Sequence, residues 1–187
     1  MKVIETYLQG VKVIEPDVYG DHRGWFMETF SSAKFLEAGI NIDFVQDNQS
    51  FSSQKGTLRG LHYQLNPKAQ TKLVRCTRGA IYDVAVDIRK ESPTYGKWLG
   101  IELTSENKKQ LLIPKGFAHG FMTLTDEVEV QYKVDELYHP QCDRGIIWDD
   151  KAIGIKWPMG ITPILSKKDK NAPLFKEAEN NFFYGET

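Results

Sequence analysis

Short stretches in which apolar and polar residues alternate recur along most of this chain. In the segment 127–134, valines and a tyrosine occupy every second position, with charged residues and a glutamine between them. In 80–88 the two aspartates fall on the face opposite the apolar one. Because successive side chains of a strand point to opposite faces, this period of two predicts β-strands. A turn-rich segment is predicted at 17–24, and further strands at 11–16, 25–30, 44–53, 57–64, 72–76, 98–103, 110–113 and 121–125.

Helical periodicity is scarce. Only the segment 31–38 has the features of a helix, with Ser31 or Ser32 as N-cap and Gly39 just past its end. The tail from Trp148 onward is rich in proline and lysine, which predicts loops and one short helix. Many short strands joined by close turns are typical of an antiparallel sandwich or barrel, and the missing helices argue against an α/β fold.

Composition narrows the class of protein further. The 187 residues fit one domain, spanning 1–187, whose core is large enough to need no disulfides. The 24 lysines and arginines nearly balance the 25 acidic residues. This net charge of −1 excludes binding of nucleic acid through the overall charge of the protein. No apolar run approaches the roughly 18 residues of a membrane span, and the early Glu5 is unlike a signal peptide. Cys76 and Cys142 form no CxxC motif, which favours a protein of the reducing cytoplasm. From the charge balance and the lack of a long apolar run, we expect neither a nucleic-acid nor a membrane partner.

The histidines show no metal-binding pattern. None of the four has a second histidine two or four residues away. A metal site is therefore disfavoured, although ligands from distant parts of the chain could still converge. The GxGxxG, Walker A, GxSxG and HExxH motifs are also missing from the sequence, so we expect neither metal nor cofactor.

Polar side chains nevertheless interrupt one predicted strand. Arg59 and His62 both lie in 57–64, where strict alternation places them on opposite faces. A bulge near Gly60 would turn both side chains into the interior of a barrel. The alternative is an edge-strand histidine with a surface arginine.

Other candidates have a functional and a structural interpretation. Gln46 and Asn48 share a face, where carboxamides suit sugar hydroxyls and base edges, unless this is a solvated edge strand. His119 stands in a glycine-bracketed loop and could hold a diphosphate together with three cations, Arg23, Arg59 and Lys72. A tight turn with an incidental histidine is the alternative.

Tyr132 and Asp169 are candidates of the same kind. Tyr132 lies on the apolar face of its strand, where most tyrosines only pack. Asp169 lies in a charge run typical of a solvated surface, yet a carboxylate there could orient a histidine.

Six motifs in one order resemble the dTDP-4-dehydrorhamnose 3,5-epimerase family. They are GDHRG at 20–24 followed by Phe26 and Glu28, the triplet 46–48, LRGLH at 58–62, PKGFAHGF at 114–121, the strand that carries Tyr132, and LSKKD at 165–169. The resemblance extends from about residue 11 to residue 173. It implies an all-β, cupin-type double-stranded β-helix, a jelly-roll barrel with short helices and an extended C-terminal tail. It also implies a homodimer that needs no metal.

The resemblance implies a role for each matching residue. His62 is the general base, Asp169 its carboxylate partner, Tyr132 the general acid on the opposite face of the sugar, and Lys72 the group that stabilises the enolate. Tyr138 stacks on the thymine. The remaining expected contacts with the dTDP-sugar are Arg23, Phe26, Glu28, Gln46, Asp47, Asn48, Arg59, Lys72, His119, Asp143 and Lys168. The family often carries glutamate at the position of Asp143.

The implied reaction is epimerisation at C3 and C5 of dTDP-4-dehydro-6-deoxy-D-glucose, a step towards dTDP-L-rhamnose for cell-surface polysaccharides such as the O-antigen. A C4 ketone acidifies both carbons, and a histidine is a suitable base near neutral pH. Three alternatives remain at this point. The first is a relative that acts at only C3 or only C5, or on another 4-keto-6-deoxy sugar nucleotide. The others are a sugar-nucleotide-binding barrel without catalysis and a metal-dependent cupin oxygenase.

Overall fold

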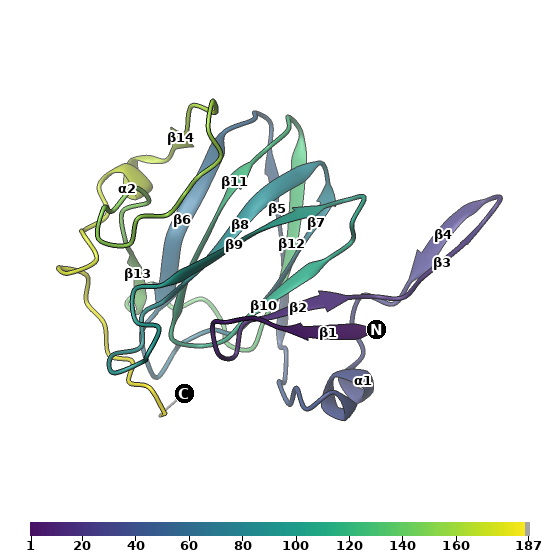
Figure 1. Cartoon of the computed structure of the whole chain (residues 1–187), viewed down its shortest axis with the longest axis horizontal. Helices are drawn as coiled ribbons and strands as arrows, with labels where there is room; N and C mark the ends of the chain where they lie inside the picture. Colours follow the sequence, from purple (N-terminus) through teal and green to yellow (C-terminus); the bar gives the residue numbers. More distant parts are fainter. Residues whose placement is uncertain (186–187) are drawn as a thin grey trace.

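Two β-sheets face each other in the computed structural model, which describes residues 1–185 (Figure 1). The first sheet has the order β1 (Lys2–Glu5), β2 (Lys12–Glu15), β10 (Gln110–Ile113), β7 (Lys72–Arg78), β12 (Val128–Val134) and β5 (Gln46–Ser52). The second has the order β13 (Asp143–Gly145), β6 (Thr57–Gln64), β11 (Phe117–Thr123), β8 (Ala80–Asp87) and β9 (Trp98–Thr104). Neighbouring strands are antiparallel, except that β14 (Ile164–Leu165) pairs in parallel with β6. This is the predicted jelly-roll architecture, although the sheets do not close into a continuous barrel.

The predicted helix forms as α1 (Ser32–Glu37), and both of its ends are capped. The Ser31 hydroxyl accepts a hydrogen bond from the backbone N–H of Lys34. At the other end Gly39 has a φ of +75°, and the N–H of Ile40 donates to the carbonyl of Phe35. A left-handed glycine with this bond closes a helix in the Schellman manner. The tail contains the short helix α2 (Lys167–Lys170).

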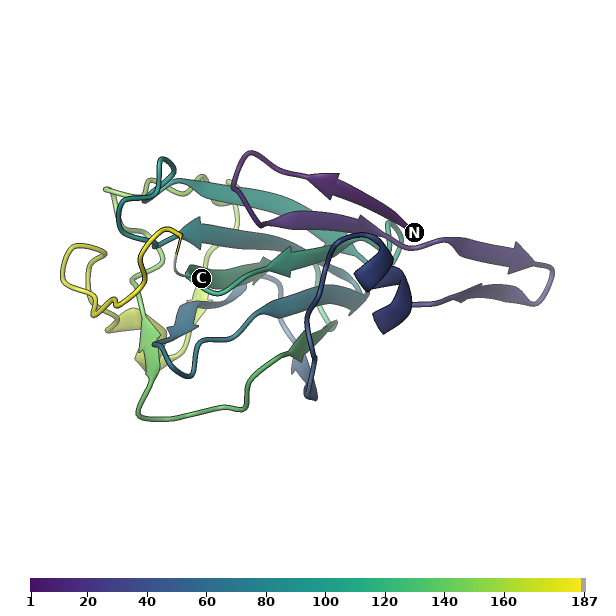
Figure 2. The ribbon, with the colours of Figure 1, turned by 90° about the horizontal axis from the view of Figure 1, so that it is seen from below.

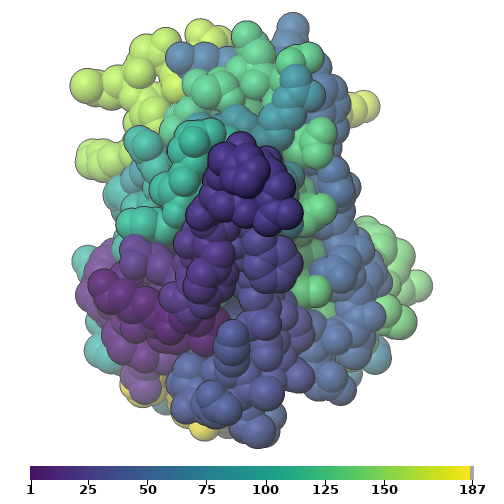
Figure 3. Space-filling view, turned by 90° about the vertical axis from the view of Figure 1, so that its right-hand side faces the viewer, coloured from purple at the N-terminus to yellow at the C-terminus, as the bar shows by residue number. Residues whose placement is uncertain are grey.

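The segment 17–30 differs from its prediction. Part of the expected turn region is the strand β3 (Val18–Asp21), and the strand expected over 25–30 is β4 (Gly24–Met27), which ends three residues earlier. Among residues 1–185 the two strands pair only with each other, and they project from the sandwich, as Figure 2 shows and as Figure 3 shows from the tip. We call residues 18–27 the arm. Its aromatic side chains lie in the open, with Trp25 58% and Phe26 69% exposed.

Two other strands are more deeply buried than expected. The glycine-bracketed segment is a strand from Phe117 onward, not a loop, and all seven residues of β11 are buried. In β8 the polar face is buried as well, because Asp83 pairs with His119 and Asp87 pairs with Arg89. A carboxylate tolerates a position without water when such partners replace its hydration.

The tail covers the outer face of the second sheet. Phe182 is fully buried there beside Tyr63, whose hydroxyl donates to the carbonyl of Glu179 at 2.5 Å. The side chain of Asn180 donates to the carbonyl of Ile88 at the end of β8. The tail therefore supports β6 and β8 from outside. Within residues 1–185, neither helix is long and apolar enough to cross a membrane.

We expect Phe182→Ala to lower the free energy of unfolding by about 3–5 kcal/mol, because it opens a cavity in a packed cluster. Urea denaturation measures the loss. The neighbouring Phe183→Ala is the control and should cost about 1 kcal/mol or less, since Phe183 is partly exposed. Equal losses for both variants would contradict a tail anchored by Phe182.

Candidate active site

A polar cavity opens between the two sheets. It consists of two adjoining hollows of about 340 and 280 Å³, and both are lined by His62, Lys72, Tyr132 and Lys168. β6 supplies the histidine from one sheet, and β7 and β12 supply Lys72 and Tyr132 from the other. The base and the acid implied by the resemblance therefore stand on facing walls of one cavity.

An irregularity in β6 brings Arg59 and His62 to the same side. His62 pairs with His119, and Arg59 pairs with Phe121, so three residues of β6 span two of β11. This is the bulge predicted near Gly60. A Cβ at Gly60 would lie 2.6 Å from the Cα of Gly120, so the strands can approach this closely only without a side chain. Both Arg59 and His62 line the smaller hollow.

His62 is held by a buried carboxylate. Its Nε2 lies 2.6 Å from Oδ1 of Asp169, and the Ser166 hydroxyl donates to Oδ2 of Asp169 at 2.8 Å. Burial by itself raises the pKa of Asp169. The hydrogen bonds from His62 and Ser166 and the charge of Lys168 outweigh it, so the pKa of this carboxyl lies below its ordinary value. An ionised Asp169 keeps the proton of His62 on Nε2 and leaves Nδ1 as the basic nitrogen.

The facing wall supplies a proton donor and a cation. Burial raises the pKa of Tyr132, with the charge of Arg59 acting in the opposite direction, so the phenol stays protonated at neutral pH. Burial lowers the pKa of Lys72 to about 8, against the charges of Asp83 and Asp143. Lys72 is therefore mostly protonated at pH 7 and can stabilise negative charge in the cavity.

Polar side chains line the mouth of the larger hollow. Gln46 and Asn48 face it from β5, joined by a hydrogen bond of 2.7 Å. β5 is the edge strand of its sheet, yet alternation still directs these two carboxamides inward. Tyr138 donates to Oδ2 of Asp143 at 3.1 Å, and Lys168 forms an ion pair with the same oxygen.

His119 lines the smaller hollow and is nearly buried. Its Nε2 lies 2.7 Å from Oδ1 of Asp83. Sequence reasoning did not select Asp83, because a carboxylate opposite an apolar face is usually solvated. It also missed Ser166 and Gln64. Strand alternation places Gln64 on the same face as His62, and this was the one feature of the sequence that could have identified Gln64 as a cavity residue.

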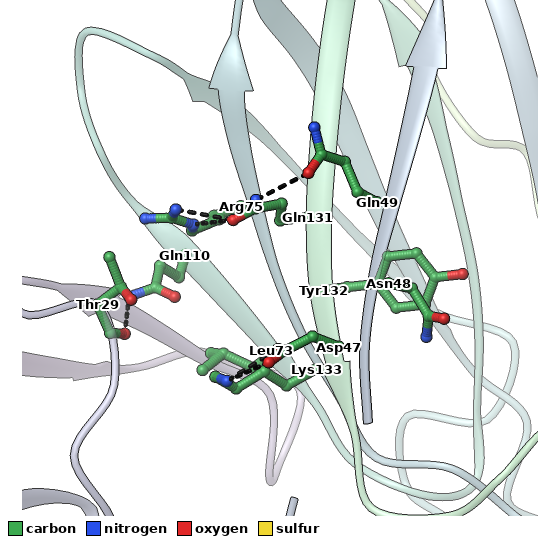
Figure 4. A pocket seen from close by; sticks show the side chains of 10 residues that line it. All are labelled: Thr29, Asp47, Asn48, Gln49, Leu73, Arg75, Gln110, Gln131, Tyr132 and Lys133. Atoms are coloured by element: carbon green, nitrogen blue, oxygen red, sulfur yellow. Dashed lines mark hydrogen bonds and ion pairs between the residues drawn. The ribbon is translucent and has the colours of Figure 1, made fainter. Parts of the chain in front are cut away.

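The structure does not bring Asp47 to the cavity. Alternation along β5 turns it outward, where it pairs with Lys133 at 2.8 Å and its side chain is 74% exposed. It lines a separate groove of about 330 Å³ on the outer face of the sheet (Figure 4). In that view Asn48 and Tyr132 point away from Arg75 and its hydrogen-bond partner Gln131, towards the other face. The prediction that Asp47 contacts the substrate is therefore wrong for the cavity of the same chain.

Arg23, Phe26 and Glu28 are also outside the cavity of their own chain. The first two lie in the arm, where Arg23 pairs with Asp21, and Glu28 follows it and pairs with Lys34 at 2.9 Å. The arm points away from the sandwich (Figure 1). Among residues 1–185 there is no group of three or more histidine, cysteine or acidic side chains placed to hold a metal ion.

Comparisons with known proteins agree on one family. The profile described as dTDP-4-dehydrorhamnose 3,5-epimerase matches residues 5–177. A protein of that name from Shigella flexneri is 56% identical over 96% of this chain and 98% of its own. The crystal structure of the Bacillus anthracis epimerase with TDP and PPi bound has a TM-score of 0.90 and 52% identity, over 92% of this chain and 98% of its own. That of the Legionella pneumophila epimerase with dTDP-4-keto-L-rhamnose has a TM-score of 0.90 and 47% identity, over 94% and 93%.

The lowered pKa of Lys72 predicts a pH-dependent stability. Its pKa is about 8 in the folded chain and near the ordinary 10.5 when unfolded, so the unfolded state binds more protons between these values. The free energy of unfolding then rises with pH, because the cost of burying the ammonium is relieved. Lys72→Met removes this cost and should be more stable than the wild type at about pH 7, with a difference that shrinks towards about pH 10.

Urea denaturation across this range tests the expectation. The exposed Lys2→Met controls for the loss of one positive charge. A stability difference for Lys72→Met that stays constant with pH would contradict the depressed pKa.

Proposed function

Because the chain belongs to the dTDP-4-dehydrorhamnose 3,5-epimerase family, we propose that it converts dTDP-4-dehydro-6-deoxy-D-glucose to dTDP-4-dehydro-L-rhamnose by inverting C3 and C5. The observation that carries the proposal is the placement of a histidine–aspartate pair and a tyrosine on facing walls of one cavity. Inversion needs removal of a proton from one face and return of a proton from the other. A binding site without catalysis would need neither group.

His62 acts as the base. Its Nδ1 takes the proton from the carbon next to the C4 ketone, and the electron pair of the broken C–H bond moves onto the C4 oxygen to form an enolate. Asp169 stabilises the imidazolium that results, because it stays ionised 2.6 Å from Nε2. The proton on His62 then passes to water.

Tyr132 and Lys72 act from the opposite wall. The ammonium of Lys72 stabilises the enolate oxygen where charge develops. Tyr132 donates its phenolic proton to the far face of the carbanion and regains one from water. The same sequence at the second carbon completes the double inversion, and each inverted carbon carries a hydrogen from solvent.

The nucleotide occupies the rest of the cavity in this proposal. Arg59, His119 and Lys168 supply positive or hydrogen-bonding groups for the diphosphate. Tyr138 stacks on the thymine at the mouth. Asp143 lies beside both Lys168 and Tyr138, although its side chain is shorter than the glutamate that the family often carries.

We also propose a homodimer in which the arm of each copy enters the partner's site. The resemblance implies that Arg23, Phe26 and Glu28 contact the substrate, but none of the three lines the cavity of its own chain, and the arm projects away from the sheets (Figure 1). In the part of the chain that the structure describes, the arm has two unpaired strand edges and exposed aromatic rings, and β5 beside the cavity mouth is also an unpaired edge. Such edges pair readily with another chain. When two copies exchange their arms, the arm edges and the β5 edges are covered in both copies.

A cytoplasmic location is consistent with this assignment. Both Cys76 and Cys142 are free thiols, as expected in a reducing compartment. No metal or cofactor enters the proposed chemistry.

Solvent exchange tests the reaction. In deuterated water, dTDP-4-keto-6-deoxy-D-glucose should gain deuterium at both C3 and C5, located by NMR. His62→Asn should lower kcat by about 10³-fold with the fold intact, because the base is lost. Tyr132→Phe should keep proton abstraction better than completed epimerisation. Tyr95→Phe, a partly exposed tyrosine outside the cavity, is the matched control.

The other outcomes identify the alternatives. Label at only one carbon indicates an epimerase acting at that carbon. No label despite dTDP binding indicates a different keto sugar or a binding protein without catalysis. Near-normal turnover by His62→Asn would remove His62 from the role of base.

Complementation tests the exchanged arm. Arg23→Ala/Phe26→Ala and His62→Asn should each be inactive alone. When the two chains are co-expressed and mix freely, about a quarter of the wild-type activity should return, because half the dimers contain one complete site. If the arm served its own chain, mixed dimers would contain no complete site and the mixture would stay inactive.

A further inference from the structure

One buried carboxamide holds the backbone on both sides of Tyr138. The Gln64 Nε2 donates to the carbonyl of Leu137 at 3.1 Å, and the N–H of His139 donates to the Gln64 Oε1 at 2.7 Å. Nε2 also donates to the carbonyl of Lys68 at 2.6 Å. Two acceptors face the NH₂ group and a donor faces the oxygen, so these partners define the orientation of the amide.

The backbone of Gln64 holds the other partner of Tyr138. Gln64 lies opposite Asp143 in the pairing of β6 with β13, and the carboxylate of Asp143 accepts the hydrogen bond of the Tyr138 hydroxyl. The N–H of the next residue, Leu65, donates to the carbonyl of Cys142 at 2.9 Å. A single position of the strand that carries His62 thus fixes both the loop of Tyr138 and the residue that Tyr138 contacts.

The ring of Tyr138 has little support of its own. It is 59% exposed at the mouth of the larger hollow, whereas Gln64 is only 4% exposed. The direction of the ring therefore depends on the backbone at 137–139. An apolar side chain in place of Gln64 would leave two carbonyls and one N–H with one hydrogen bond fewer each, and the loop would rearrange to reach water.

We infer that Gln64 is a positioning residue for nucleobase recognition: it holds Tyr138 in the orientation that stacks on the base of a pyrimidine nucleoside diphosphate. This inference rests on the proposed function for the identity of the ligand. It gives two residues on the same face of β6 different roles. His62 acts on the sugar, and Gln64, two residues later, positions the ring that binds the base.

Calorimetric binding of dTDP and of inorganic pyrophosphate to Gln64→Met tests the inference. The dissociation constant of dTDP should rise about tenfold, because a ring that is no longer held in place loses its stacking on the base, and a stacked aromatic pair contributes about that much to binding. That of pyrophosphate should not change, because it has no base. In a Tyr138→Ala background, Gln64→Met should have no further effect on dTDP.

Asn180→Leu is the matched control. Its carboxamide also joins two backbone groups, the carbonyl of Ile88 and the N–H of Phe182, but it lies in the tail, away from the cavity. It should leave both dissociation constants unchanged. If Gln64→Met does not fold, Gln64→Asn, which keeps the amide on a shorter side chain, takes its place, and the dTDP constant should again rise selectively.

Three results would overturn the inference: unchanged dTDP binding by a folded variant, equal weakening of dTDP and pyrophosphate, or a full effect of Gln64→Met in the Tyr138→Ala background. Equilibrium binding needs no turnover, so these results are independent of the epimerase assignment. A chain that binds dTDP as expected but exchanges no hydrogen would contradict the proposed reaction and leave the role of Gln64 intact.

Discussion

The contact between Gly60 and Gly120 is the constraint on which the active site depends. A Cβ at Gly60 would lie 2.6 Å from the Cα of Gly120, and a Cβ at Gly120 would lie 2.8 Å from the carbonyl oxygen of Arg59. Only two glycines allow β6 and β11 to lie this close while β6 carries an extra residue. Without that residue, the pleat of the strand would direct Arg59 and His62 to opposite faces of the sheet. The bulge thus places a histidine and an arginine in one cavity.

Paired charges make this cavity possible inside a β-sandwich. Asp169 and Asp83 are both buried, and each lies within hydrogen-bond distance of a histidine that lines the cavity, His62 or His119. Burial of an unpaired carboxylate would be costly, whereas a paired one holds its histidine in a single orientation. Lys72 differs: within residues 1–185 its ammonium forms no ion pair, and its pKa is lowered to about 8. A cation without a partner can respond to charge that develops on a bound substrate.

In the homodimer that we propose, one chain does not form the whole site. The open aromatic surface of Trp25 and Phe26 would be a liability in a monomer, because water would surround two large apolar side chains. An arm that docks on a second copy buries that surface and brings Arg23 close to a diphosphate. Dimerisation and substrate binding are then properties of the same residues.

Much of this protein is determined locally by its sequence. Period-two alternation identified most of the strands, and Ser31 and Gly39 marked the ends of α1, because side-chain spacing and capping act over a few residues. Alternation also directed Gln46 and Asn48 inward, and the same rule excludes Asp47 between them.

Only the tertiary structure determined which side chains from distant parts of the chain come into contact. His62 and Asp169 are 107 positions apart in the chain, and their contact depends on long-range strand pairing and packing, as do the hydrogen bonds of Gln64 to the loop of Tyr138. Spacing along the chain carries no information about such distances, because they are set by the order of strands in the two sheets and by the packing of the tail against them.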